Sequence, residues 1–161
     1  MKVGIMADSH DNLPKIRSAM EVFRAEGVGL ILHAGDFVAP FAVRAMTPAP
    51  ARVVAVFGNN DGERIGLAKA FEAMGEVHPR IAIVQVEGKR IGVVHQDELV
   101  APLSASNAID VLVYGHTHHL DIRREGNVLV VNPGEVGGWL TGRSTVVVLD
   151  TQSLETKVVE L

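Results

Sequence analysis

The chain has 161 residues, of which 47% are hydrophobic and 21% charged, and it carries a net charge of −4 at pH 7. It contains no cysteine, which excludes disulfides, thiolate metal sites and cysteine nucleophiles. Lysine and arginine are scattered, so the sequence predicts no basic nucleic-acid-binding face. The length fits one domain over residues 1–161, since a chain of this size buries about 70% of the surface that it exposes when unfolded.

The first residues argue against export. The apolar run that follows Lys2 ends at Asp8 after five residues, whereas a secretory signal needs about 7–15 apolar residues. No other stretch reaches the roughly 18 apolar residues of a membrane span. We therefore expect a cytoplasmic protein without a membrane partner, and the hydrophobic balance is compatible with a homo-oligomer.

Strands and helices alternate in the first half of the expected structure. The expected elements are a strand over residues 2–7, a helix over 13–26, a strand over 28–32, a short helix over 40–46 and a strand over 52–57. The longer helix follows from apolar residues at three- and four-residue spacing, with Asp11 or Asn12 as its N-cap and Gly27 at its end. Such alternation predicts parallel strands joined by right-handed crossovers.

The second half is expected to contain more antiparallel pairing. Its expected elements are a hairpin of strands over 81–86 and 91–95 with Gly88 in the turn, a helix over 99–107, and strands over 111–114, 121–124, 128–131, 144–150 and 156–161. The chain has no repeat, low-complexity tract or linker. The pattern therefore indicates an α/β fold in which two sheets pack face to face with helices outside.

Polar side chains interrupt this apolar pattern where the expected strands end. They are Asp8 and His10 after the first strand, Asp36 after the second, Asn59 after the third, His95 at the end of the hairpin, and His116 and His118 after the strand over 111–114. Ligands of α/β proteins bind at the carboxyl ends of the strands. We therefore expect these seven side chains to converge at one edge of the sheets.

The seven side chains have the chemistry of a metal site. Imidazole together with carboxylate suits Zn, Fe, Mn, Ni and Co, and an amide oxygen favours the harder ions among them. One ion takes about four to six ligands, so seven fit two ions that share a carboxylate. Asp36, which is central and preceded by Gly35, is the expected bridge. His116 and His118 are two residues apart, so in an extended segment both would point the same way.

The segments that carry these residues resemble the signature of the calcineurin-like metallophosphoesterases, and in particular their small bacterial and archaeal phosphodiesterase branch. The matching segments are Asp8-Ser9-His10, Gly35-Asp36, Gly58-Asn59-Asn60-Asp61, His95, Gly115-His116-Thr117-His118, Asn132-Pro133-Gly134 and Gly142-Arg143-Ser144. The resemblance implies a four-layer αββα sandwich with two mixed β-sheets. It also implies one ion held by Asp8, His10, Asp36 and His118, and another held by Asp36, Asn59, His95 and His116. Mn²⁺ is the ion expected first, with Ni²⁺, Co²⁺, Fe²⁺ or Zn²⁺ as alternatives.

The activity that the resemblance implies is hydrolysis of a small phosphodiester by a hydroxide that bridges the two ions. Hydrolysis of phosphomonoesters at the same site is the alternative within this class. A non-catalytic protein-interaction scaffold is the alternative outside it, because one subunit of the retromer coat is similar in fold. Eroded ligands would mark a scaffold, and all seven positions here hold competent ligands.

Two positions depart from the family pattern. The family commonly has His-Gly-His where this chain has His95-Gln96-Asp97, and many larger relatives carry a histidine at the position of Asn60. Asn60 can donate a hydrogen bond to the substrate phosphate but cannot supply a proton, so we expect water to protonate the leaving group. Asp61 is interpreted as a residue that orients its neighbours rather than as an acid.

Some residues have interpretations that do not involve a metal. For the seven expected ligands the alternatives are helix caps, turn residues beside glycine and exposed loop positions. His33 lies in a strand that reads as buried and is expected to be a hydrogen-bonded core histidine. His119 is expected at the surface. Trp139, the only tryptophan, either lines a substrate groove or is a packing residue.

Overall fold

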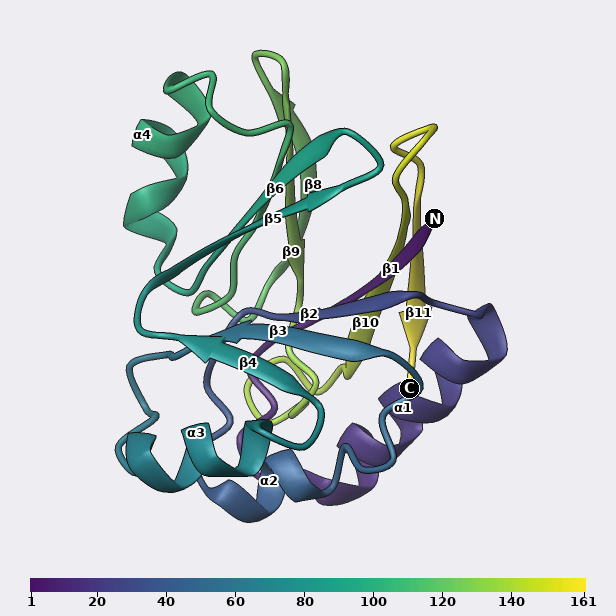
Figure 1. Cartoon of the computed structure of the whole chain (residues 1–161), viewed down its shortest axis with the longest axis vertical. Coiled ribbons are helices and arrows are strands. Elements are labelled where there is room, and N and C mark those ends of the chain that lie inside the picture. The colour runs from purple at the N-terminus through teal and green to yellow at the C-terminus, as the bar shows by residue number, and fades with distance from the viewer.

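Two β-sheets pack against each other in the computed structural model, which describes residues 1–161 (Figure 1). The strands of the first sheet are β1 (Lys2–Met6), β2 (Leu30–His33), β3 (Arg52–Val56), β4 (Gly75–His78), β10 (Thr145–Asp150) and β11 (Thr156–Glu160). Their order across the sheet is β11-β10-β1-β2-β3-β4. The strands β1 to β4 run parallel, whereas β10 pairs antiparallel with both β1 and β11.

The second sheet is also mixed. Its strands are β5 (Ile81–Val86), β6 (Lys89–Val94), β7 (Val111–Val113), β8 (Leu120–Glu125) and β9 (Val128–Pro133). They lie in the order β5-β6-β7-β9-β8. The three central strands are parallel, and the two edge strands β5 and β8 pair antiparallel with their neighbours. The larger share of antiparallel pairing expected in the second half is therefore confirmed.

Helices cover the outer face of each sheet (Figure 1). They are α1 (Leu13–Glu26), α2 (Pro40–Arg44) and α3 (Arg64–Phe71) against the first sheet, and the 3₁₀ turn η1 (Asp97–Leu99) with α4 (Val100–Ala105) beside the second. Side chains of β1 alternate between layers: Ile5 packs with residues of the second sheet, and Met6 with residues of α1. The four-layer αββα sandwich is confirmed. None of the helices combines the length and the apolar character that crossing a bilayer requires.

The helix α1 has the boundaries that its sequence signals predict. The Asn12 side chain accepts a hydrogen bond from the Lys15 N–H at 3.3 Å, as an N-cap does. Gly27 ends the helix with a left-handed φ of 66°. Between these ends, the buried face consists of Ile16, Ala19, Met20 and Phe23. Caps and periodicity agree here, so the helix matches the expected range over 13–26.

Two elements between residues 61 and 80 were not predicted. In α3 only Leu67 and Phe71 are buried, while Ile65 is 89% exposed, so the helix has almost no apolar period. The strand β4 lies at the edge of the first sheet and has no fully buried residue, so it lacks the alternation of a half-buried strand. Both elements are specified by their neighbours rather than by their own pattern.

Gly4 is a position of close packing between β1 and α1. A Cβ atom at this position would lie 2.7 Å from the ring of the buried Phe23. We expect Gly4→Ala to lower the free energy of unfolding by about 1–3 kcal/mol, because the core has no room for the added methyl group. Gly62→Ala is the matched control, since a Cβ there meets no atom within 4 Å. Urea unfolding of the two variants measures the difference, and equal midpoints would contradict the close packing.

Candidate metal centre

The seven side chains expected to converge do so, in loops at the carboxyl ends of five strands. Asp8 and His10 follow β1, Asp36 follows β2 and Asn59 follows β3, all in the first sheet; His95 follows β6, and His116 and His118 follow β7, in the second. Backbone hydrogen bonds tie these loops together: Asp8 N–H donates to Gly35 O at 3.0 Å, and His10 N–H to Asp36 O at 3.1 Å. The cluster therefore lies where the two sheets meet.

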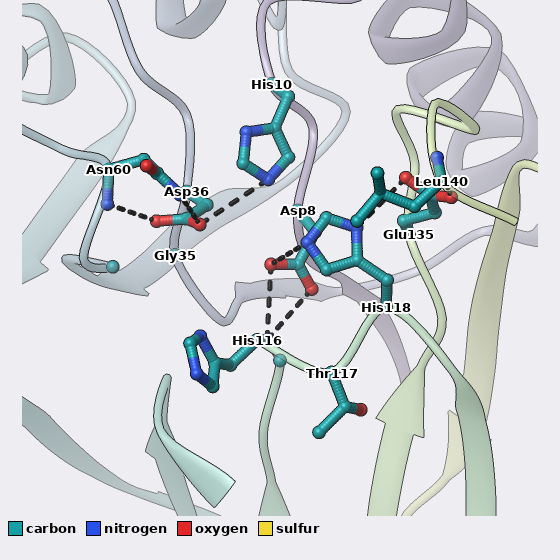
Figure 2. Close-up of polar contacts among 12 residues, drawn as sticks. Asp8, His10, Gly35, Asp36, Asn60, His116, Thr117, His118, Glu135 and Leu140 are labelled. Atoms are coloured by element: carbon teal, nitrogen blue, oxygen red, sulfur yellow. Dashed lines mark hydrogen bonds and ion pairs between the residues drawn. The ribbon is translucent and has the colours of Figure 1, made fainter.

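Asp36 contacts histidines from both sheets. Its Oδ2 lies 3.4 Å from Nε2 of His10 and 3.5 Å from Nε2 of His95. Asp8 is the second carboxylate, with Oδ1 3.8 Å from Nε2 of His118. Figure 2 shows His10 facing Asp36 and His118 facing Asp8. The side chains form two groups, and within each group the potential ligand atoms all lie within 4.8 Å of one another. One group is Asp8, His10 and His118, and the other is Asp8, Asp36 and His95, so Asp8 belongs to both.

Asn59 and His116 complete the cluster on the side of His95. The Asn59 Oδ1 lies 2.8 Å from His95 Nε2. The His116 ring packs edge-on against the His95 ring, with centroids 5.1 Å apart. The backbone N–H of His116 also donates to both carboxylate oxygens of Asp8, at 3.2 and 3.1 Å.

The backbone of this cluster is unusual. Ten residues other than glycine have a positive φ, and five of them are expected ligands: Asp8, His10, Asp36, His116 and His118. The extended segment expected at 116–118 is thus wrong, because φ is 71° at His116 and 63° at His118. Left-handed conformations of non-glycine residues cost free energy and persist only where surrounding structure enforces them. The fold therefore maintains this arrangement against a local preference.

The electrostatics of the cluster favour a cation. Asp8 and Asp36 are almost completely buried, and burial together with the charge of Asp36 raises the pKa of Asp8 well above its usual value. Burial lowers the pKa of His10 and of His95, which keeps both rings neutral and able to coordinate. The buried His10 Nε2 has no hydrogen-bond partner. Two buried carboxylates among neutral imidazoles are the donor set of a divalent transition-metal site.

A family model for the calcineurin-like phosphoesterase superfamily domain matches residues 1–154. The chain belongs to this superfamily. This phosphoesterase is a metal-dependent hydrolase of phosphate esters, as the names of its relatives indicate.

Several relatives of the phosphoesterase are similar over most of their length. The phosphodiesterase MJ0936 of Methanocaldococcus jannaschii is 37% identical over 165 residues, which cover 100% of this chain and 99% of the relative. The phosphodiesterase YfcE of Escherichia coli is 30% identical over 84% of this chain and 79% of its own. A solved structure of an archaeal phosphodiesterase superposes with a TM-score of 0.95, at 36% identity and with full coverage of both chains.

A vacuolar protein sorting protein is also similar in fold. Vacuolar protein sorting 29 of Cryptosporidium parvum covers 99% of this chain and 96% of its own, with a TM-score of 0.71 and 19% identity. At this identity the likeness shows a shared fold and nothing about activity.

Asp61 orients two of the loops of the phosphoesterase, in agreement with its interpretation from sequence. Its buried carboxylate accepts hydrogen bonds from the backbone N–H groups of Asp36 at 3.0 Å, Val38 at 2.8 Å and Gly58 at 2.7 Å. The loop that follows β2 and the loop that follows β3 are therefore held by one side chain.

His33 is the hydrogen-bonded core histidine that the sequence predicts. It is fully buried, and its Nδ1 accepts from the Gly35 N–H at 3.1 Å. The proton of the ring therefore resides on Nε2, which lies 3.3 Å from Ser9 Oγ. Burial lowers the pKa of His33, in keeping with a neutral ring. His119 is exposed, as expected.

Asn60 contacts Asp36 directly. Its side-chain amide donates to Asp36 Oδ2 at 2.7 Å and its backbone N–H to Oδ1 at 2.9 Å. Figure 2 shows this amide directed at the carboxylate that also faces His10. Asn60 thus lies one contact from the other expected ligands, through Asp36.

Glu135 is the residue of the site that the sequence analysis missed. Its buried carboxylate lies 3.0 Å from Nδ1 of His118 and accepts from the backbone N–H groups of Trp139, Leu140 and Thr141. Burial acts to raise the pKa of Glu135, but the hydrogen bonds from Thr141, His118 and Leu140 outweigh it and the pKa is lowered. The only sequence signal is the position of Glu135 directly after Asn132-Pro133-Gly134, which names no partner for it.

Glu135 fixes the orientation and tautomer of His118. A carboxylate at Nδ1 keeps the proton there and leaves Nε2 free to coordinate. We expect Glu135→Gln to weaken binding of Mn²⁺ by about 10–100-fold, the usual effect of losing such a partner. Isothermal titration of metal-free protein measures it. Glu125→Gln removes an exposed carboxylate as the matched control, and unchanged Mn²⁺ affinity in Glu135→Gln would show that the ring is positioned by packing alone.

Proposed function

We propose that the protein hydrolyses phosphodiesters and that its seven convergent side chains hold two divalent ions. One ion would be held by Asp8, His10, Asp36 and His118, and the other by Asp36, Asn59, His95 and His116, with Mn²⁺ as the first candidate. The observation that carries the proposal is the position of the Asp36 carboxylate, whose Oδ2 reaches a histidine of each set at 3.4 and 3.5 Å.

Divalent ions held by these residues would activate a water near neutral pH and offset the charge of the substrate phosphate. The chain's own residues hold the ligand side chains and the substrate in position. Burial keeps the rings of His10 and His95 neutral, Glu135 directs His118, and Asp61 directs the loop of Asp36. Asn60 donates a hydrogen bond to the phosphate and offers no proton. Because water then protonates the leaving group, esters with acidic leaving groups should react faster.

The preference for diesters is supported by relatives that carry this activity in their names. The phosphodiesterase MJ0936 matches over the whole chain, and the phosphodiesterase YfcE over most of it. All seven expected ligand positions are intact and clustered, which supports catalysis over a scaffold role.

The test compares bis(p-nitrophenyl) phosphate with p-nitrophenyl phosphate on metal-free protein supplied with Mn²⁺, Ni²⁺, Co²⁺, Mg²⁺ or Zn²⁺. We expect metal-dependent turnover with a higher kcat/KM for the diester. A higher value for the monoester would overturn the diester assignment and leave the metal chemistry in place. Metal-loaded protein that hydrolyses neither ester would overturn the proposal as a whole. Metal analysis of the loaded protein tests the count of two ions separately.

A further inference from the structure

Two large apolar side chains stand exposed beside the metal cluster. Trp139 is 64% exposed and Leu140 is 75% exposed. They belong to the segment 137–141, here called the rim loop. The sequence left open whether Trp139 lines a substrate groove or serves packing, and this exposure favours contact with a substrate. An exposed tryptophan next to a site of ester chemistry is available to contact a substrate.

Hydrogen bonds connect the rim loop to three residues in or beside the set of expected metal ligands. The indole Nε1–H of Trp139 donates to the backbone carbonyl of His10 at 3.1 Å. The N–H groups of Trp139 and Leu140 donate to Glu135 at 3.0 and 2.9 Å, the carboxylate that also holds His118. The N–H of Gly137 donates to the backbone carbonyl of Asp8 at 2.9 Å. The loop is thus bonded directly to two expected ligands, His10 and Asp8, and through Glu135 to a third, His118.

Glycines shape the rim loop so that the indole lies against its backbone. A Cβ on Gly137 would lie 2.9 Å from Cδ1 of Trp139, so the ring edge covers this position. Gly138 has φ of 67°, which lets the chain turn immediately before Trp139. One edge of the indole is therefore fixed by the Gly137 backbone and by the bond to His10, while most of the side chain faces solvent.

Resting on the proposed function, we infer that Trp139 forms a stacking surface for a planar aromatic ring in the substrate. The ring would be carried by the alcohol group of the phosphodiester that is retained on phosphorus. An aromatic face recognises any flat ring, so an aryl group and a nucleobase are both suitable. Leu140, beside His118 in Figure 2, extends the apolar rim. The residue is specificity-determining and takes no part in bond cleavage.

The kinetic test uses three p-nitrophenyl esters that share a leaving group and differ in the retained group: methyl, phenyl and thymidine-5′. Release of p-nitrophenolate from the Mn²⁺-loaded protein gives kcat/KM for each. We expect kcat/KM to be higher for the phenyl and thymidine esters than for the methyl ester. Trp139→Ala should lower the ratio of kcat/KM for each of these two esters to that for the methyl ester by about tenfold. This lies within the range for stacking of one base on one aromatic side chain. Trp139→Phe retains an aromatic face and should restore most of the preference.

Ile83→Ala is the control, because Ile83 is an apolar residue of β5 with a similar exposure of 62% and lies outside the metal cluster. It should leave the phenyl-to-methyl and thymidine-to-methyl ratios of kcat/KM unchanged. A larger loss for the phenyl ester than for the thymidine ester identifies an aryl group as the partner, and the reverse identifies a nucleobase. Equal ratios in the wild type and Trp139→Ala would overturn the inference while the proposed function stands. Turnover of none of the esters by the wild type would overturn both.

Fluorescence gives a readout that does not depend on turnover. Trp139 is the only tryptophan, so its emission reports on this position alone. Phenylphosphonate should change the emission of the Mn²⁺-loaded protein saturably, at the concentrations at which it inhibits hydrolysis, whereas methylphosphonate should not. Inhibition by phenylphosphonate without a change in emission would place its ring away from Trp139 and contradict the inference.

Discussion

Asp36→Asn should lower kcat/KM for bis(p-nitrophenyl) phosphate by at least about 10³-fold. The substitution keeps the size of the side chain and removes the charge that faces His10 and His95 from 3.4 and 3.5 Å. A catalytic ion contributes several kcal/mol to the transition state, and 1.36 kcal/mol corresponds to tenfold in rate. Because Asp36 contacts both proposed ligand sets, the variant should also bind less than two ions per chain. Kinetics and metal analysis of the same preparation measure both effects.

The matched control for this variant is Glu21→Gln, which makes the same carboxylate-to-amide change at an exposed position of α1. It should leave both the rate and the metal content unchanged. If Asp36→Asn kept two ions and a rate within tenfold of the wild type, the shared position of this carboxylate would be wrong.

Asp61→Ala should lower the free energy of unfolding by about 4 kcal/mol. It removes the acceptor of three backbone N–H groups, at 2.7 to 3.0 Å. Each buried donor left without a partner costs about 1–3 kcal/mol. For a chain of this size the loss corresponds to a fall in Tm of about 10 °C. Urea and thermal unfolding of the metal-free protein measure it without a contribution from bound ions.

Asp110→Ala is the matched control for Asp61→Ala. Asp110 also accepts a backbone N–H, from Arg90 at 2.7 Å, but it lies at the surface, where water replaces the lost acceptor. Its removal should cost less than about 1 kcal/mol. Similar losses in both variants would mean that the loops after β2 and β3 do not depend on Asp61 for their stability.

The elements that sequence predicts well are those whose own residues specify them. The helix α1 has an apolar face, an N-cap at Asn12 and a left-handed end at Gly27, and its range is reproduced. The helix α3 and the strand β4 have no such signals and were missed. They form because β3 and α2 provide surfaces that only the assembled fold presents.

The same division holds within the site. Its seven expected ligands are recognisable because Asp, Asn and His stand at the ends of apolar strands, which parallel topology brings together. The partnership of Glu135 with His118 is not recognisable, since it joins residues 17 positions apart on different strand ends. Neither is the left-handed backbone of His116 and His118, which depends on packing around the loop rather than on local preference.

The seven expected ligands come from loops of both sheets of the sandwich. Each proposed ion takes ligands from loops of both sheets, so binding would clamp one half of the protein to the other. An ion at 100 times its Kd adds about 2.7 kcal/mol to the stability of a folded state that alone can bind it. Chelation should therefore lower the free energy of unfolding of the whole fold, so that metal supply determines what fraction of the chain is folded.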